Sequence, residues 1–167
     1  EFGNTCILYV LDSIANYGKD VLNSVITNEE NRVLERIDTY LFDNDAYREA
    51  IINAYVHNNW QLLNSPQISV FSDRIEILSH GTLGTDQTLE GFFNGENKPA
   101  NPALAHIFIQ LGISDHSGKG VPTIVEKYGR ESFTFGDDSI TLTIRSKMPA
   151  KRKNNKKGFL RTAKNKR

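Results

Sequence analysis

YREAIINAYVHNNW, residues 47–60, is the stretch around which the rest of the chain is arranged, and its spacing predicts one amphipathic helix. Asp45 stands just before it as the expected N-cap. Glu49, Asn53 and His57 recur every four residues. Because each residue advances about 100° around a helix, these three side chains lie along one stripe. The sequence therefore predicts a helix with a polar stripe beside an apolar face.

The polar stripe has two interpretations. Three polar residues on one side of an amphipathic helix are often only its solvated face. In the chemical interpretation, the carboxylate of Glu49 orients or deprotonates a water, and the carboxamide oxygen of Asn53 is a hard ligand that suits Mg²⁺. The loops further along the chain help to decide between the solvated-face and the chemical interpretation.

Composition narrows the class of protein. A chain of 167 residues with 38% hydrophobic residues predicts one domain with an ordinary core. The sequence has no apolar run of transmembrane length, no signal-peptide pattern and one cysteine, Cys6, so an internal disulfide is excluded. We therefore expect a cytoplasmic protein without a membrane partner. Because the chain begins without Met, we also expect a fragment of a longer protein.

The net charge of zero hides an asymmetry. Residues 145–167 contain eleven Lys and Arg and no acid, so the preceding 144 residues hold nine bases against all 20 acids, a net charge of −11. We expect residues 147–167 to form a disordered tail and residues 1–146 to form the domain. The tail has two open interpretations: it grips nucleic-acid phosphates, or it is solvated or folds back on the acidic body.

The other segments predict an α+β fold, in which a layered, mostly antiparallel sheet carries helices on one face. Residues 67–78 alternate apolar and polar side chains and predict a hairpin, and residues 32–38 suit a strand or a helix. The expected helices are 5–17 (ended by Gly18), 88–93, 101–111 and 121–128, and the other expected strands are 21–27, 32–38, 132–135 and 139–144.

Two glycine-containing loops lie where ligands commonly bind. Residues 79–84, SHGTLG, follow the hairpin, and Gly118-Lys119-Gly120 precedes a helix. Glycines let backbone N–H groups approach an anion, the helix N-terminus adds partial positive charge, and Lys119 adds a full one. The same pattern is also typical of a plain turn before a helix. The chain contains neither a Walker A loop nor a Rossmann fingerprint.

In order, these motifs resemble the GHKL ATPase fold, the superfamily of gyrase, Hsp90, histidine kinases and MutL. More narrowly, the chain resembles the C-terminal ATPase-like domain of bacterial RecG-related transcriptional regulators, in which this domain usually follows a Schlafen/AlbA-type domain. The resemblance rests on REAIINAYVH at 48–57, NPALA at 101–105, LG at 111–112 and GKGVPTI at 118–124.

The resemblance implies a role for each matching residue in a site for ATP and Mg²⁺. Glu49 matches the catalytic carboxylate that positions the attacking water, and Asn53 matches the asparagine that binds the metal. Gly81 matches a glycine of the loop that contacts adenine, and Ser79 stands where the superfamily has the Asp that receives the adenine amino group. Three further residues match the phosphate-side loop: Gly118, Lys119 and Gly120.

Departures from the family pattern leave two hypotheses. Ser79 replaces a charge-assisted hydrogen bond with a neutral one, which weakens binding roughly tenfold, and Leu83 stands where a second glycine is usual. The first hypothesis is a Mg–ATP-binding regulatory domain, with weak ATPase activity at most, of a DNA-associated transcriptional regulator. DNA would contact the tail or domains outside this chain. The second is a degenerate GHKL-fold module for homodimerisation or protein interaction.

The remaining histidines and aromatic residues are expected to be structural. The four histidines lack the spacing of a zinc site. We expect His57 to pack at the end of its helix, and we expect the large aromatic residues to lie in the core rather than form a base-stacking platform. These aromatic residues are Trp60, Phe92, Phe93 and Phe108.

Overall fold

The computed structural model describes residues 5–23, 25–27, 38–84, 86–96, 98–114 and 118–147. Its main sheet has four antiparallel strands in the order β3-β4-β6-β5, which confirms the predicted α+β class. The hairpin β3 (Gln67–Val70) and β4 (Arg74–His80) lies where the alternating pattern predicts it. The last two strands, β5 (Phe133–Phe135) and β6 (Ser139–Arg145), complete the sheet.

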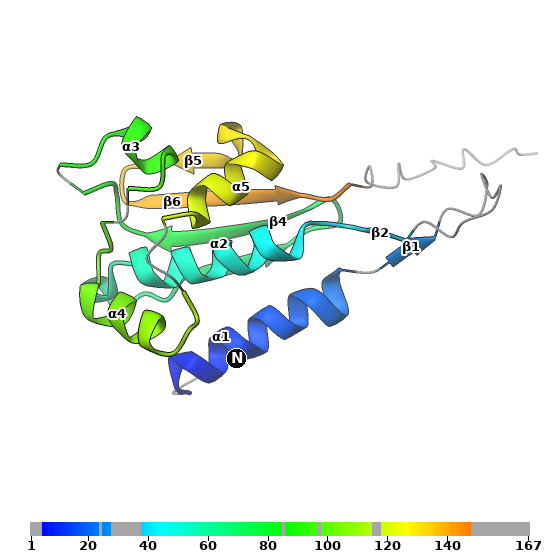
Figure 1. Ribbon diagram of the computed structural model, residues 1–167, viewed down its shortest axis with the longest axis horizontal. Helices are drawn as coiled ribbons and strands as arrows, with labels where there is room; N and C mark the ends of the chain where they lie inside the picture. The colour runs from blue at the N-terminus through cyan, green and yellow to red at the C-terminus, as the bar shows by residue number, and fades with distance from the viewer. Residues whose placement is uncertain are drawn as a thin grey trace, which may run out of the picture.

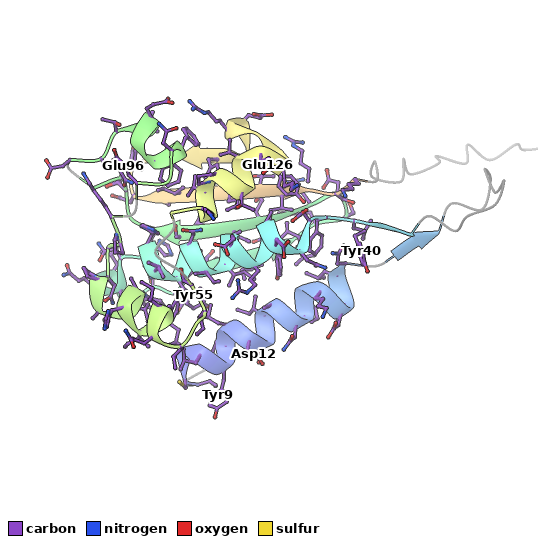
Figure 2. All side chains as sticks on the ribbon, in the orientation of Figure 1. Tyr9, Asp12, Tyr40, Tyr55, Glu96 and Glu126 are labelled. Atoms are coloured by element: carbon purple, nitrogen blue, oxygen red, sulfur yellow. The ribbon has the colours of Figure 1, made fainter. Side chains whose placement is uncertain are left out.

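The helices form layers on one face of this sheet. The central helix α2 (Asn44–His57) lies against β4, and α1 (Ile7–Tyr17) lies on the side of α2 away from β4 (Figure 1). The helix α5 (Gly120–Tyr128) packs beside α2. Tyr9 is 72% exposed and projects from α1 away from the body (Figure 2).

The core fills the space between the sheet and α2. Along β4, Ile75, Ile77 and Ser79 point inward and are buried, while the residues between them are partly exposed. The inward face of β6 continues this layer, since Ile144 pairs with Ile75 and Leu142 with Ile77. Eight residues of α2 are buried, so both α1 and the sheet cover it: Ala46, Tyr47, Ala50, Ile51, Ile52, Ala54, Tyr55 and Val56. The central helix is therefore a core helix with one polar stripe.

Asp43, and not Asp45, caps the N-terminus of α2, so the predicted cap is wrong. The Asp43 carboxylate accepts a hydrogen bond from the backbone N–H of Ala46 at 3.0 Å. The backbone N–H of Asp43 itself donates to the Tyr128 hydroxyl at 2.7 Å. This contact with α5 fixes Asp43 just outside the helix, and Asp45 lies in the first turn.

The predicted helix end at Trp60 is also wrong, because α2 ends at His57 and Trp60 begins a short 3₁₀ turn, η2 (Trp60–Leu62). Asn58 causes this early end. Its buried carboxamide donates to the Asn64 carbonyl oxygen at 2.8 Å and accepts from the backbone N–H of His80 at 2.9 Å. The chain therefore turns to meet the end of β4.

α1 ends at Tyr17 with Gly18 as its C-cap, as predicted, but the helical path does not stop there. The φ and ψ of Gly18 are −60° and −48°, and the chain continues as a π-helical turn, η1 (Gly18–Leu22). The strand expected over 21–27 is therefore confined to β1 (Val25–Thr27), which pairs with β2 (Asp38–Tyr40). Residues 28–37, which include most of the strand expected over 32–38, lie outside the described residues, as do residues 148–167 of the predicted tail.

The later helices agree closely with the sequence. α3 (Leu89–Phe93) begins after Thr88, whose side chain accepts from the backbone N–H of Gly91 at 3.0 Å. α4 (Pro102–Gln110) begins after Asn101, whose side chain accepts from the backbone N–H of Leu104 at 3.0 Å. A short 3₁₀ turn, η3 (Arg130–Ser132), leads into β5. The strand therefore begins at Phe133, one residue later than predicted. Phe108 is fully buried and Phe92 is 8% exposed, as expected for core residues.

Replacing Gly18 with Ala is expected to destabilise the fold. In an open helical position Ala is favoured over Gly by about 1 kcal/mol. Here Gly18 is buried, and an added Cβ would overlap the ring of Tyr47. We expect Gly18→Ala to lower the free energy of unfolding by about 1–3 kcal/mol, measured by chemical denaturation.

Tyr47→Leu supplies the matched background for this test. Leucine leaves the ring's space open, so adding Gly18→Ala to this variant should cost much less. An equal cost in both backgrounds would show that the ring is not the cause.

Candidate functional site

The polar stripe of α2 lines a hollow between α2, α4 and α5. Glu49, Asn53 and His57 all contribute to its wall, as the four-residue spacing predicts. The loop before α5 forms the opposite wall through Gly118, Lys119 and Gly120. We call this the stripe hollow. Residues that are 61–71 positions apart in the chain thus face one another across it.

Gly120 makes the closest approach between the two walls. A Cβ added to this glycine would lie 2.6 Å from Asn53 Nδ2 and 2.8 Å from Glu49 Oε2. A larger residue here would displace the ends of these two side chains or move α5 away from the stripe. Gly120 is also the first residue of α5, and the N-cap residue Lys119 makes no side-chain capping hydrogen bond. The free N–H groups of a helix N-terminus and the partial positive charge there favour an anion.

Asn53 is oriented by its own helix. Its Nδ2 donates to the backbone carbonyl of Glu49 at 2.8 Å, one turn earlier. The carboxamide oxygen takes no part in that bond and is the hard oxygen donor of the stripe. The metal-ligand role that the resemblance implies for this oxygen stays a prediction.

Arg48 holds Glu49 and the chain after α4 together, a role that the sequence did not reveal. Arg48 Nη1 lies 3.5 Å from Glu49 Oε1, and Nη2 donates to the carbonyl oxygen of Ile113 at 2.7 Å. The Glu49 side chain is 27% exposed, so water reaches it. The sequence signal for Arg48 was its place beside Glu49 in the motif.

His57 stands where three hollows meet. It lines the stripe hollow, a second hollow against the sheet, and a third one beside residues 82–84. Burial lowers the pKa of His57 from its ordinary value of 6.5 to about 4, so its imidazole is neutral at pH 7. The sequence predicted only that His57 packs at the helix end, and the structure adds its place at this junction.

Ser79 lies in the wall of the second hollow, which we call the sheet hollow. Its side chain is 8% exposed, and its hydroxyl donates to the carbonyl oxygen of Ile140 at 3.5 Å. Asn53, His57 and Phe92 line both this hollow and the stripe hollow. The structure thus places Ser79 next to the stripe.

Gly81 is not in the lining of the three hollows, although the resemblance assigns it a contact with adenine. Its φ of +126° requires a glycine, and its N–H donates to the Asp138 carbonyl oxygen at 2.8 Å. An added Cβ would lie 3.5 Å from the carbonyl oxygen of His57. Gly81 therefore shapes the turn after β4.

The sequence analysis missed Gly95, which contacts the phosphate-side loop. Gly95 and Gly118 both have positive φ, 85° and 64°. A Cβ on either glycine would overlap the other's carbonyl oxygen. The loop after α3 is therefore packed directly on the loop before α5. The signal available in the sequence was a glycine just after a short helix, a common helix terminator.

Two features are absent from the described residues, a cluster of metal ligands and a membrane-spanning helix. No group of three or more His, Cys, Asp or Glu side chains within these residues is arranged to hold a metal ion. No helix among them has the length and apolar character needed to cross a membrane.

Part of the chain matches a protein-family model. Residues 64–144 match the family described as "Putative ATP-dependent DNA helicase recG C-terminal". This match supports an ATPase-like domain. It includes Ser79, Gly81 and the loop of Gly118 and Gly120, and it begins after α2, which carries the polar stripe.

Comparison with solved structures supports the fold. The chain is similar to the crystal structure of the DIP2311 protein from Corynebacterium diphtheriae, with a TM-score of 0.68 and 20% sequence identity. The similarity covers 85% of this chain and 30% of that one, so this chain spans less than a third of the length of DIP2311. At this identity the likeness shows the fold alone. Comparison with curated protein sequences gave no significant match.

The low pKa of His57 predicts that the fold loses stability in mild acid. The unfolded chain takes up the proton near pH 6.5, and folded His57 takes it up near pH 4. Protons therefore favour the unfolded state as the pH falls from about 6.5 towards 4. Between pH 7 and pH 5 this lowers the free energy of unfolding by about 1–2 kcal/mol.

His57→Gln should remove this part of the pH dependence, measured by chemical denaturation at several pH values. His106→Gln is the matched control, because His106 is exposed on α4 and should leave the slope unchanged. The same slope in the parent and in His57→Gln would contradict the assignment.

Proposed function

We propose that this domain binds a magnesium–nucleoside triphosphate complex, with ATP as the ligand, in the stripe hollow and the sheet hollow. The observation that carries the proposal is the approach of Gly120 to Asn53 and Glu49, where an added Cβ would lie within 3 Å of both side chains. This contact joins a helix N-terminus, a lysine, a carboxamide and a carboxylate in one hollow. Such a set suits phosphates and Mg²⁺ together.

The phosphate groups would lie against the start of α5. Gly118 and Gly120 line the hollow on this side, and Lys119 between them adds a full positive charge. The Asn53 oxygen would be the protein ligand of Mg²⁺, which commonly takes few protein ligands and completes its shell with phosphate oxygens and water. A group of three acidic or histidine ligands is not required for a site of this kind.

The base would lie in the sheet hollow. Ile77, Ile140 and Leu142 give it apolar walls, which suit the faces of an aromatic ring. Ser79 offers a hydroxyl to the edge of the base. Gly81 fixes the turn after β4, the strand that carries Ser79.

Glu49 is the proposed catalytic residue for any hydrolysis. Its carboxylate is water-accessible and lies beside the Asn53 carboxamide, so it can orient a water toward a phosphate held there. Because Arg48 lies 3.5 Å away, part of the negative charge of Glu49 is already offset in this structure. Weak turnover is the expectation that follows.

A DNA-associated regulatory role is the wider proposal. The eleven bases of residues 145–167 would contact DNA phosphates without sequence specificity, since the body with its net charge of −11 repels a duplex. Domains outside this chain would supply specific recognition.

Two departures from the resembled superfamily favour a second candidate function. Ser79 presents a hydroxyl where the resembled superfamily has a carboxylate, and Leu83 lines the third hollow where a glycine is usual. Under this alternative the fold has lost its nucleotide and acts in homodimerisation or protein interaction. The two candidates differ in their response to Mg–ATP.

Asn53→Ala is expected to abolish Mg-dependent nucleotide binding while the domain stays folded. In the parent, Mg–ATP at a hundred times its dissociation constant should add about 2.7 kcal/mol to the stability of the fold. The measurement is a thermal unfolding scan with and without Mg²⁺ and millimolar ATP. Asn16→Ala is the matched control, since Asn16 is exposed on α1 and its side chain donates to Asp12.

A shift in the parent and in Asn16→Ala, but not in Asn53→Ala, would support the proposed site. Equal shifts in all three would remove Asn53 from it. The absence of any shift would favour the interaction module. Glu49→Gln separates binding from hydrolysis, because it should keep the shift and lower phosphate release.

Deleting the predicted tail, residues 147–167, is expected to abolish the shift of a DNA duplex in a gel assay. The affinity of the parent should fall steeply between low and physiological salt, because binding releases counterions from the phosphates. The ATP-dependent thermal shift of the truncated chain is the control for folding. Unchanged DNA binding after the deletion would eliminate the tail from the proposal.

A further inference from the structure

A further hollow lies between α1 and α2, on the side of α2 away from β4 (Figure 1). Its volume is about 220 Å³. Both helices line it with residues at spacings of three and four, so one face of each helix is turned toward it. The apolar members of these faces are Leu8, Leu11 and Ala15 of α1 and Ile51 and Ile52 of α2. We call this the α1–α2 hollow.

The buried part of this lining is apolar and consists of Leu11, Ile51 and Ile52. A water molecule is held firmly only where several polar groups surround it, and these side chains offer none. Replacing poorly held water with an apolar group of a ligand is favourable. The volume of the hollow equals the share of about seven water molecules in the liquid, which suits a short aliphatic side chain.

Two exposed residues of opposite charge line the same hollow, Asp12 on α1 and Arg48 on α2. Asp12 lies near the middle of α1 (Figure 2), and its carboxylate accepts from the Asn16 carboxamide at 3.2 Å. Within the part of the chain that the structure describes, no ion pair joins Asp12 to Arg48. The hollow therefore offers one group that favours a cation and another that favours an anion.

The Arg48 guanidinium keeps donors available beyond its contacts within the chain. Its Nη2 donates to the Ile113 carbonyl oxygen at 2.7 Å, and its Nη1 lies 3.5 Å from Glu49 Oε1. A guanidinium carries more N–H groups than these two contacts use, and a carboxylate accepts such donors in parallel pairs. The ionised carboxylate of Asp12 only accepts hydrogen bonds, which suits the N–H groups of an ammonium.

A zwitterion with an apolar tail matches this lining better than a singly charged amphiphile does. An α-amino acid carries its ammonium and its carboxylate on one carbon atom, and its side chain projects from the same atom. A monocarboxylate with the same tail would meet the like charge of Asp12, and a monoamine would meet the like charge of Arg48. Each of them also leaves one charged residue of the hollow without an opposite charge.

We propose that the α1–α2 hollow binds a free α-amino acid with an aliphatic side chain. The ligand carboxylate pairs with Arg48, and the ligand ammonium pairs with Asp12. The ligand side chain lies against the buried residues Leu11, Ile51 and Ile52. This ligand is independent of the nucleotide proposed above, and it gives the domain a second small-molecule site.

The experiment titrates the whole 167-residue chain with L-leucine by isothermal titration calorimetry, and follows its thermal unfolding in millimolar L-leucine. 4-Methylpentanoate and 3-methylbutylamine are matched ligands, because each keeps the tail of leucine and lacks one of its charges. Glycine keeps both charges and lacks the tail. We expect L-leucine to raise the unfolding temperature and to bind at least about tenfold more tightly than each of the three others.

Three variants test the position of the ligand. Asp12→Asn removes the negative charge and keeps an oxygen acceptor, so it should weaken L-leucine at least about tenfold and favour 4-methylpentanoate relative to it. Asp20→Asn is the matched control, because Asp20 is an exposed acid on η1 and does not line the hollow. Ala15→Leu fills the hollow and should abolish the binding of L-leucine. Circular dichroism checks that each variant is folded.

Three results would overturn the proposal. The first is no binding of L-leucine at millimolar concentration, whether or not Mg–ATP binds. The second is equal affinity for L-leucine and 4-methylpentanoate, which would remove the role of the ammonium. The third is unchanged binding of L-leucine in both Asp12→Asn and Ala15→Leu, which would place the ligand elsewhere. Because the comparison of the four ligands uses the parent chain, it decides the ligand class even if a variant does not fold.

Discussion

The approach of the α5 N-terminus to the polar stripe of α2 is the contact on which the candidate site depends. It exists because Gly120 has no side chain: a Cβ there would meet both Asn53 and Glu49. Helix packing distances are normally set by the side chains at the contact. With a glycine at this point, α5 comes close enough for its N-terminal N–H groups and the stripe to share one hollow. A helix N-terminus and a polar stripe are each common features. Here they line the same hollow and together form the candidate site.

The sheet supplies the second wall and fixes its position. β4 lies between β3 and β6, and its pairing with β6 holds its end in register. α2 covers its inward face. Asn58 then ties that end to α2 through the backbone N–H of His80, and Asn59 adds a second backbone bond to His80 at 2.6 Å. These bonds place Ser79 beside the polar stripe of α2. The outward face of the sheet remains polar, with Arg74 paired to Glu76 and Asp73.

Charge along the chain falls into two parts, an acidic body and a basic C-terminal segment. The acidic body carries a local positive feature at Lys119 and the start of α5, which suits a small polyanion rather than a duplex. The basic segment 145–167 suits an extended polyanion.

The sequence by itself determined what depends on neighbouring residues. The alternation over 67–78 gave the hairpin, Asn101-Pro102 gave the start of α4, and the four-residue spacing of Glu49, Asn53 and His57 gave the stripe. These features follow from backbone geometry and capping within a few residues, which a sequence displays directly.

Only the tertiary structure decided the features that depend on contacts between distant segments. The Tyr128 hydroxyl selected Asp43 as the cap, and Asn58 ended α2 by bonding to β4. Tyr47 packs against the site where Gly18 lets the helical path continue, and Gly120 brought the phosphate-side loop onto the stripe. In each case the deciding partner lies far away in the chain. The spacing of residues in the sequence does not reveal such a pairing. The free energy that selects it comes from packing and hydrogen bonds that form only in the folded state.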